Sequence, residues 1–342
     1  MSEIVLSVLV ISHNQRELLP RCLDSILTQE LDVPYEVVIS DDRSSDGTWE
    51  LIETYTRQYP EIIRGVKCNS DECDPITRSE RCGWNKGTAY RHARGEFFVN
   101  IDADDYLRGN DIYQKQLDAL RSHPDCSMCQ QRVWQVEDGE PIESGYAWPS
   151  HPRLKEGAVL GAKEIIRNGL VGLNQTYMIR RHAEEDPVGK YGKWFDDTII
   201  TLHHLQYGNV VFIDRADYIW VQYKGSISNS MKNWDKQILY ALLPYQHALL
   251  IPKFQDLFMT QTNRHIVRLL KQSLFGKIAL QETTTQYLRQ FKGFIFQFYA
   301  NGQKGIISRF RLLRALMLYR QIKKGTKGGS EVRSRLYQLL VG

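Results

Sequence analysis

The sequence predicts an α/β fold in which helices flank an open, mostly parallel sheet. Three observations support this prediction: apolar strands rich in β-branched residues, helical segments that alternate with them, and polar loops at the strand ends. Residues 4–11 show the first, because they are too uniformly apolar to alternate between a buried and a solvent-facing side. Such a run is typical of a parallel strand that is covered on both faces.

The expected elements follow one another at the intervals of strand–helix–strand units. Polar residues 12–14 end the first strand and lead into a helix. The loop 41–48 is rich in Asp, Ser and Gly, which favour turns and helix starts, so a second helix is expected from Thr48. Strands joined by helices in this way form parallel sheets. We expect strands near 4–11, 35–40, 62–66, 96–101, 127–136 and 210–221, and helices near 16–29, 48–59, 84–93 and 114–122.

Charge is distributed unevenly along the chain, although the formal net charge is only +4. Residues 1–229 hold 25 Lys and Arg against 36 Asp and Glu, whereas residues 230–342 hold 19 against 4. After about Ser226, apolar residues recur at helical spacing. We therefore expect an acidic body at 1–228, divided near residue 110, and a helical, basic C-terminal region at 229–342.

A cytoplasmic location is the expectation from the apolar runs, the N-terminus and the cysteines. Every apolar run is much shorter than a membrane span, and the acidic start at 1–3 lacks the pattern of a secretory signal. The six cysteines fit a reducing compartment. Cys68, Cys73 and Cys82 crowd one loop, where a structural metal is the alternative to free thiols.

Two acidic loops directly follow predicted strands. Asp41 and Asp42 come after the second strand, and the run 102–105 comes after the fourth. Open α/β sheets bind ligands at the carboxyl ends of their strands, and carboxylates so close together repel one another unless a cation compensates. Their hard oxygens suit Mg²⁺ or Mn²⁺, which in turn bind the oxygens of a diphosphate. The alternative is a pair of solvated turns, or the capped start of a helix.

These segments resemble the successive signatures of family 2 glycosyltransferases with the GT-A fold. Their order and spacing match the family over about residues 5–228, and Asn85-Lys86-Gly87 falls at the family's Asn-X-Gly. Each signature alone is weak, whereas the combination is specific. The segments that carry the resemblance are 8–14 (VLVISHN), 38–48 (VISDDRSSDGT) and 95–105 (GEFFVNIDADD).

The resemblance implies an inverting transfer from a nucleoside diphosphate sugar, with a UDP-sugar as the first expectation and Mn²⁺ or Mg²⁺ as the cofactor. It implies a GT-A-like catalytic domain at 1–228, with a nucleotide-binding part at about 1–110 and an acceptor part at about 111–228. Asp104 is favoured as the direct metal ligand. The implied donor-binding residues are His13, Asp41, Asp42, Asn85, Asp102 and Asp104, and the implied metal ligands are Asp102, Asp104 and Asp105.

An inverting transfer also needs a base that takes the proton from the acceptor hydroxyl. Residues 191–202 resemble the family's Glu-Asp segment, in which a carboxylate opens the helix under the acceptor. Asp197 is the candidate base, and Asp196, at the family's Glu position, is the second catalytic candidate. The alternative is that both acids only favour the helix N-terminus through its dipole.

The chain departs from the family pattern at two positions. Trp84 stands where an arginine often precedes the Asn-X-Gly, so Arg78 or Arg81 is expected to contact the diphosphate instead. Tyr223 stands where a histidine frequently ligates the metal, just before Gly-Ser-X-Ser at 225–228. Fewer protein ligands, or a weaker dependence on metal, are therefore expected. The Gln-X-X-Arg-Trp signature of processive synthases is absent, which favours single-sugar addition.

The basic region does not resemble these signatures. Residues 306–320 alternate apolar and basic faces at helical spacing, and Lys323, Lys324 and Lys327 extend the charge. Such a helix can lie on the inner face of the cell membrane against anionic lipid, which would suit a glycan or lipid-linked acceptor in surface polysaccharide synthesis. The equal alternative is a helix packed on the acidic body. Nucleic-acid binding is not expected, since no recognised module accompanies the charge.

Two other functions remain open from the sequence. A sugar-phosphate nucleotidyltransferase also couples an acidic metal site to a βαβ body, but it would need a Gly-rich, Lys- or Arg-bearing loop after the first strand, where this chain has residues 12–16 (SHNQR). The second is a catalytically weak nucleotide-sugar-binding or membrane-scaffold protein, which the departures at Trp84 and Tyr223 keep open.

Overall fold

The computed structural model describes residues 3–69, 78–168, 170, 176–182, 186–192, 195–223 and 250–258, with the backbone alone at 78–80. The chain divides into two compact units, residues 1–230 and 231–342. In the second unit, the described segment 250–258 contains a short 3-10 helix, Pro252–Phe254. The Gly-Ser-X-Ser element and the expected basic helix lie outside the described residues. No helix within the described ranges is long and apolar enough to cross a bilayer.

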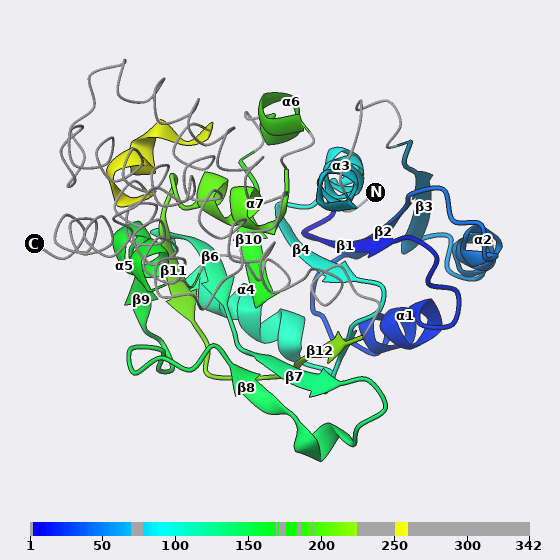
Figure 1. Ribbon diagram of the computed structural model, residues 1–342, viewed down its shortest axis with the longest axis horizontal. Helices are drawn as coiled ribbons and strands as arrows, with labels where there is room; N and C mark the ends of the chain where they lie inside the picture. The colour runs from blue at the N-terminus through cyan, green and yellow to red at the C-terminus, as the bar shows by residue number, and fades with distance from the viewer. Residues whose placement is uncertain are drawn as a thin grey trace, which may run out of the picture. The chain divides into compact units, whose positions relative to one another are not determined.

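A mixed eight-stranded sheet forms the centre of the first unit (Figure 1). Its order is β3-β2-β1-β4-β10-β6-β11-β9, in which β3, β2, β1 and β4 run parallel. From β1 the chain goes to β2 and β3 on one side and returns on the other side as β4, so the strand order reverses beside β1. The strands are β1 (Leu6–Ser12), β2 (Tyr35–Asp41), β3 (Ile63–Lys67), β4 (Phe97–Asp102), β6 (Cys126–Gln130), β9 (Val159–Leu160), β10 (Tyr177–Arg180) and β11 (Asn209–Phe212).

Helices cover both faces of this sheet, as the sequence predicts. Helices α3, α6 and α7 lie on one face, and α1 and α4 lie on the other (Figure 1). On the second face, Val8 of β1 and Val99 of β4 join Leu23 of α1 and Leu117 of α4 in the main hydrophobic core. The helices are α1 (Leu19–Leu27), α2 (Thr48–Gln58), α3 (Arg78–His92), α4 (Ile112–Ser122), α5 (Ala162–Arg167), α6 (Pro187–Tyr191) and α7 (Asp197–His204).

Two of the expected strands each divide into two shorter strands that belong to different sheets. The apolar run at 127–136 becomes β6 and β7, and the run at 210–221 becomes β11 and β12. Arg132, in the segment between β6 and β7, contacts the segment between β11 and β12. Its backbone N–H donates to the Arg215 carbonyl at 2.8 Å, and its side-chain Nε donates to the Asp214 carboxylate at 2.7 Å. The second sheet has the order β5-β12-β7-β8 and consists of β5 (Tyr106–Leu107), β12 (Tyr218–Gln222), β7 (Val133–Glu137) and β8 (Tyr146–Trp148).

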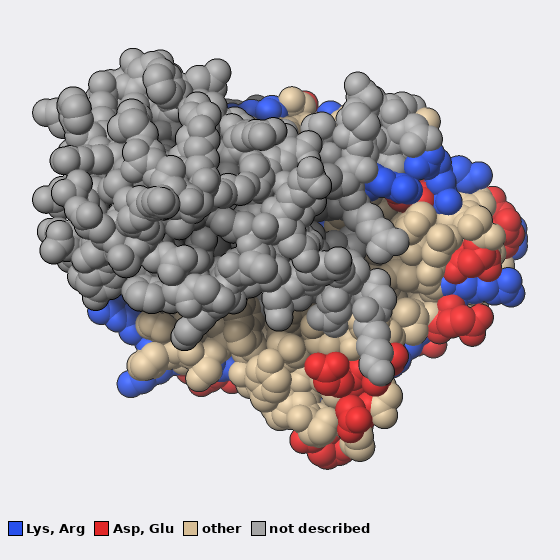
Figure 2. All heavy atoms as spheres, viewed as in Figure 1, with Lys and Arg blue, Asp and Glu red and all other residues tan. Residues whose placement is uncertain are grey.

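Acidic side chains gather around the hairpin that joins β7 to β8. Figure 2 shows them at the lower part of the view, where Figure 1 places this hairpin. Because like charges repel, this part of the surface would be kept away from an anionic membrane. The exposed acids of the segment are Glu137, Asp138, Glu140 and Glu143.

Gly95 is required where the loop after α3 passes against β1. A Cβ at this position would lie 2.7 Å from the Ser7 nitrogen and 2.7 Å from the Phe97 carbonyl oxygen. Backbone atoms cannot turn aside as the end of a side chain can, so we expect Gly95→Ala to cost about 1–3 kcal/mol of stability, as overpacked cores do. Thermal unfolding would measure this loss. Gly161→Ala is the control, because its Cβ would meet only Asn209 Oδ1 at 3.6 Å; equal losses in the two variants would contradict the prediction.

Candidate active site

The polar ends of β1, β2 and β4 meet at one edge of the large sheet. The strand register pairs Ser12 of β1 with Asp41 of β2, and Ile11 of β1 with Asp102 of β4. Both predicted acidic loops therefore lie at the carboxyl ends of parallel strands, beside the strand at which the order reverses. Ligands of open α/β sheets bind at this place in the fold.

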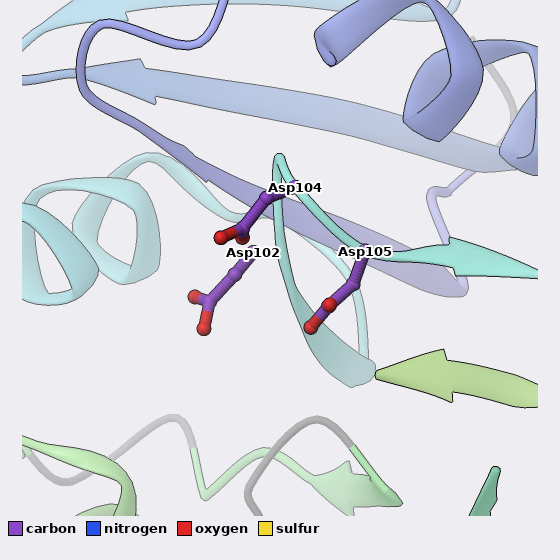
Figure 3. Close-up of side chains that lie close together, drawn as sticks. All are labelled: Asp102, Asp104 and Asp105. Carbon is purple, nitrogen blue, oxygen red and sulfur yellow. The ribbon is translucent and has the colours of Figure 1, made fainter. Parts of the chain in front are cut away.

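Asp102, at the end of β4, and Asp104 and Asp105, in the loop that follows, bring their carboxylates together (Figure 3). One carboxylate oxygen from each lies within 4.8 Å of the others, which suits joint ligation of a cation. Burial raises the pKa of Asp104 to about 6, and the negative charge of Asp102 adds to this effect. A divalent cation would relieve this repulsion, so the residues present fit the metal that the sequence predicts. In the part of the chain that the structure describes, no other group of acids, histidines or cysteines has this geometry.

Asp105 differs from the other two acids because both of its oxygens are engaged. Oδ1 accepts the Val221 N–H at 3.0 Å, and Oδ2 accepts the Tyr218 hydroxyl at 3.0 Å. Asp105 is buried, and burial, followed by the charge of Asp104, raises its pKa well above the usual value. Asp102 and Asp104 are only half-buried. Asp105 therefore anchors the loop to β12 and leaves Asp102 and Asp104 as the more accessible oxygen ligands.

Tyr223, at the family's histidine position, lies beside this loop and is bound by an arginine. Arg21 Nη2 donates to the Tyr223 hydroxyl at 3.0 Å and to the Asp104 carbonyl at 3.4 Å. The Arg21 guanidinium also lies 4.3 Å from the centre of the Tyr106 ring, within cation–π range. At the position where the resemblance implies a histidine, the chain thus has a tyrosine with a cationic partner.

Helix α7 places Asp197 opposite Asp102, with a lysine between them. Lys86 Nζ pairs with Asp197 Oδ1 and lies 3.5 Å from Asp102 Oδ1. The Lys86 side chain is 3% exposed, whereas those of Asp102 and Asp197 are 31% and 29% exposed. Burial by itself lowers the pKa of the Lys86 ammonium, but the two carboxylates outweigh it and raise that pKa well above its usual value. Lys86 is therefore a fixed positive charge between the two acids.

The two acids at the start of α7 have different surroundings. Asp196 is the N-cap, and its Oδ1 accepts the Ile199 N–H at 2.9 Å. Burial raises the Asp196 pKa to about 6. Asp196 therefore caps the start of α7, whereas the carboxylate of Asp197 contacts Lys86.

The predicted nucleobase residues lie at the ends of β1 and β2. The exposed His13 ring donates from Nδ1 to the Asp42 carbonyl, which is 2.7 Å away and can only accept. The buried Asp42 carboxylate accepts from Arg81 Nε at 3.0 Å and Nη2 at 2.8 Å. Arg81 therefore pairs with Asp42 and holds its carboxylate in place. The side chain of Arg78, the other predicted diphosphate contact, lies outside the described residues.

Asp41 and Asn85 support the ends of the strands. Asp41 accepts the Ser44 N–H at 3.0 Å and the Ser44 hydroxyl at 2.5 Å. Asn85 donates from Nδ2 to the Ser12 carbonyl at 3.0 Å, and its Oδ1 accepts from Ser40 Oγ at 2.5 Å. Both residues are buried, whereas His13 and Asp102 are more exposed.

Lys86 and Arg21 are site residues that the sequence interpretation did not single out. A signal for Lys86 does exist, because it shares a helix face with the buried residues Ala89 and Tyr90. A lysine on a buried face needs a partner of opposite charge. No comparable signal marks Arg21, since its partner Tyr223 is 202 residues away in the sequence.

Residues 7–169 match the family model described as Glycosyl transferase family 2. The chain contains a family 2 glycosyltransferase domain. Over 137 residues, this chain is 33% identical to an uncharacterized protein of Mycobacterium tuberculosis, a match that covers 39% of this chain and 37% of that protein. It is also 25% identical over 103 residues to the poly(ribitol-phosphate) beta-glucosyltransferase of Bacillus spizizenii, covering 30% of this chain and 15% of the relative. The matches thus span well under two thirds of these relatives' own length.

The fold of this domain is also found among solved structures. TarS 1-349 of S. aureus, crystallised in complex with UDP-GlcNAc, superposes with a TM-score of 0.58 over 85% of this chain and 81% of that chain, at 19% identity. The predicted family resemblance and the predicted GT-A-type α/β fold are both confirmed.

Proposed function

We propose that the protein is an inverting glycosyltransferase that moves one sugar from a nucleoside diphosphate sugar to a hydroxyl of an acceptor. The observation that carries this proposal is the convergence of Asp102, at the end of β4, with Asp197, at the start of α7, on the two sides of Lys86. A group that binds the donor diphosphate and a group that accepts a proton are the two requirements of an inverting transfer. Asp102, through a bound cation, and Asp197 would meet these two requirements.

In this mechanism Asp197 is the general base. Its carboxylate takes the proton of the acceptor hydroxyl while the hydroxyl oxygen attacks the anomeric carbon of the sugar. A new carbon–oxygen bond forms on one face of the sugar as the bond to the diphosphate breaks on the other. The nucleoside diphosphate leaves with the electron pair, and the configuration at the anomeric carbon inverts.

Asp102 and Asp104 would hold Mn²⁺ or Mg²⁺, which when bound neutralises the charge of the leaving diphosphate. The exposed ring of His13, whose Nδ1 donates to the Asp42 carbonyl, would lie against the nucleobase. The Asp42 carboxylate, held by Arg81, would accept a base N–H. This arrangement favours a base that carries an N–H next to its ring carbonyl groups, as uracil does.

A UDP-sugar is therefore the donor that we propose, and the complex of TarS with UDP-GlcNAc supports testing it first. For the acceptor we propose a glycan of the cell surface, either free or lipid-linked, to which single sugars are added. The similarity to a poly(ribitol-phosphate) beta-glucosyltransferase, whose name specifies a polymeric acceptor, supports testing polymers first. The reaction would take place in the cytoplasm, with the basic region at 229–342 held against the anionic inner face of the membrane.

A thermal-shift screen of nucleoside diphosphates and their sugars, with and without Mn²⁺, tests the proposed donor. A ligand at 100 times its dissociation constant adds about 2.7 kcal/mol to stability, so UDP with Mn²⁺ should raise Tm by several degrees. GDP, CDP and ADP with Mn²⁺ serve as controls for the base. The proposal fails if no nucleotide or nucleotide sugar stabilises the protein.

A further inference from the structure

Lys86 contacts the two acids that the proposed chemistry assigns to different substrates. Asp102 serves the donor in that chemistry, and Asp197 serves the acceptor, but the lysine contacts both. It projects from the middle of α3, whereas its partners lie at the end of β4 and the start of α7. Three separate elements thus meet at one ammonium group.

Asp102 and Asp197 balance the positive charge of the Lys86 ammonium. Cys82, one helical turn earlier, is a nearby thiol, and burial raises its pKa to about 12, so it stays neutral. Losing one partner of a buried ion pair is costly, because a charge is then left without compensation. The lysine and the two carboxylates therefore hold one another in place.

The exposure of the three groups differs in a way that a purely structural ion pair does not require. The ammonium is 3% exposed, while the side chains of Asp102 and Asp197 are 31% and 29% exposed. The lysine thus reaches the carboxylates from inside the protein and leaves their other sides open. Those open sides are where an acceptor hydroxyl and a cation would approach.

We propose that Lys86 is a positioning residue that orients Asp197 and serves as the built-in counter-ion of the carboxylates before the divalent cation binds. This inference rests on the proposed function, and it deepens the account of the same site. Orientation of Asp197 promotes turnover, because the base must lie within hydrogen-bonding reach of the hydroxyl. The positive charge beside Asp102 opposes a second cation, because like charges repel.

These two effects predict changes of opposite sign when the charge is removed. In Lys86→Met, Asp197 loses its fixed orientation, so kcat should fall roughly 100-fold, within the range typical of acid–base groups. The same variant should bind Mn²⁺ roughly tenfold more tightly, since an opposing charge a few ångströms away is gone. Lys86→Arg keeps the charge and should show nearly wild-type Mn²⁺ affinity with partly restored kcat.

The experiment measures Mn²⁺ binding by electron paramagnetic resonance on the full chain, without turnover, and then kcat and KM for UDP-sugar transfer. Lys115→Met is the matched control, because Lys115 pairs with Asp111 on the exposed face of a helix, at 2.6 Å. It should change neither quantity. Lys86→Gln, which loses the charge but keeps a hydrogen-bond donor for Asp197, is measured in parallel in case the methionine variant does not fold.

Tighter Mn²⁺ binding together with a lower kcat and a nearly unchanged donor KM supports the proposal. Unchanged or weaker Mn²⁺ binding in a folded, charge-neutral variant overturns it. A structural role alone would lower both stability and Mn²⁺ affinity, and Lys86→Arg would not restore kcat. If the wild-type protein transfers no sugar, the proposed function fails, and the Mn²⁺ titration still decides the counter-ion role of Lys86 by itself.

Discussion

Replacing Asp197 with asparagine should reduce sugar transfer roughly 10²- to 10⁴-fold while nucleotide binding persists. An amide has nearly the shape of a carboxylate but cannot take a proton, and a loss of this size is typical of a missing general base. Its oxygen can still accept a hydrogen bond from Lys86, so the site should keep its shape. Initial rates of UDP-sugar transfer, together with the UDP-induced shift in Tm, would measure the two properties separately.

Asp196→Asn is the informative comparison for this prediction. Asparagine caps helices about as well as aspartate, so the contact with the Ile199 N–H and the start of α7 should persist. We expect a much smaller loss of transfer than in Asp197→Asn. Equal losses would give Asp196 a part in the chemistry, and undiminished transfer by Asp197→Asn would remove the assigned base. A protein that binds nucleotide sugars without turnover would show no transfer in the wild type.

Replacing Asp104 with asparagine should weaken Mn²⁺ binding and lower kcat/KM by roughly 10²-fold or more. Groups that only support a metal ligand are typically worth 10- to 100-fold, and a ligand itself should be worth at least as much. Because burial and Asp102 already disfavour the ionised form of Asp104, the neutral amide should leave the fold intact. Mn²⁺ titration and the metal-dependent part of the UDP thermal shift would measure the effect.

Asp118→Asn is the control for the metal prediction. Asp118 is an exposed acid on α4 that accepts a hydrogen bond from Gln114 at 2.9 Å, so its loss changes net charge equally. It should leave Mn²⁺ binding unchanged. If Asp104→Asn binds Mn²⁺ as tightly as Asp118→Asn does, then Asp104 is not a metal ligand.

The parts of the fold that the sequence predicted correctly are those with strong periodicity. Strands β1, β2 and β4 are nearly unbroken apolar runs, and each lies within a residue or two of its expected position. The start of α3 was wrong by six residues, at 78 in place of 84, because its first turns are polar. The two strand breaks were missed because apolar residues resume on both sides, and hydrophobicity does not show which sheet a strand joins.

For the candidate site, local signatures predicted which residues follow the strands but did not predict their side-chain contacts. The positions of Asp102 and Asp42 after strands follow from motif order, and their meeting at one edge follows from parallel topology. The contacts made by side chains depend on geometry that a motif does not encode. Arg81 was expected at a diphosphate and pairs with Asp42, and Lys86 bridges two acids that lie 95 positions apart.

The anchoring of Asp105 to Tyr218 and Val221 affects when the site can form during synthesis of the chain. The loop that carries Asp102 and Asp104 is made early, but its partner strand is added more than 110 residues later. A nascent chain that ends before β12 would have the four parallel strands without the anchor of their acidic loop. Contacts so distant in sequence also slow folding. Cation binding would therefore develop only after β12 has been made and paired, so that the growing chain acquires its parallel strands before its acidic loop is fixed.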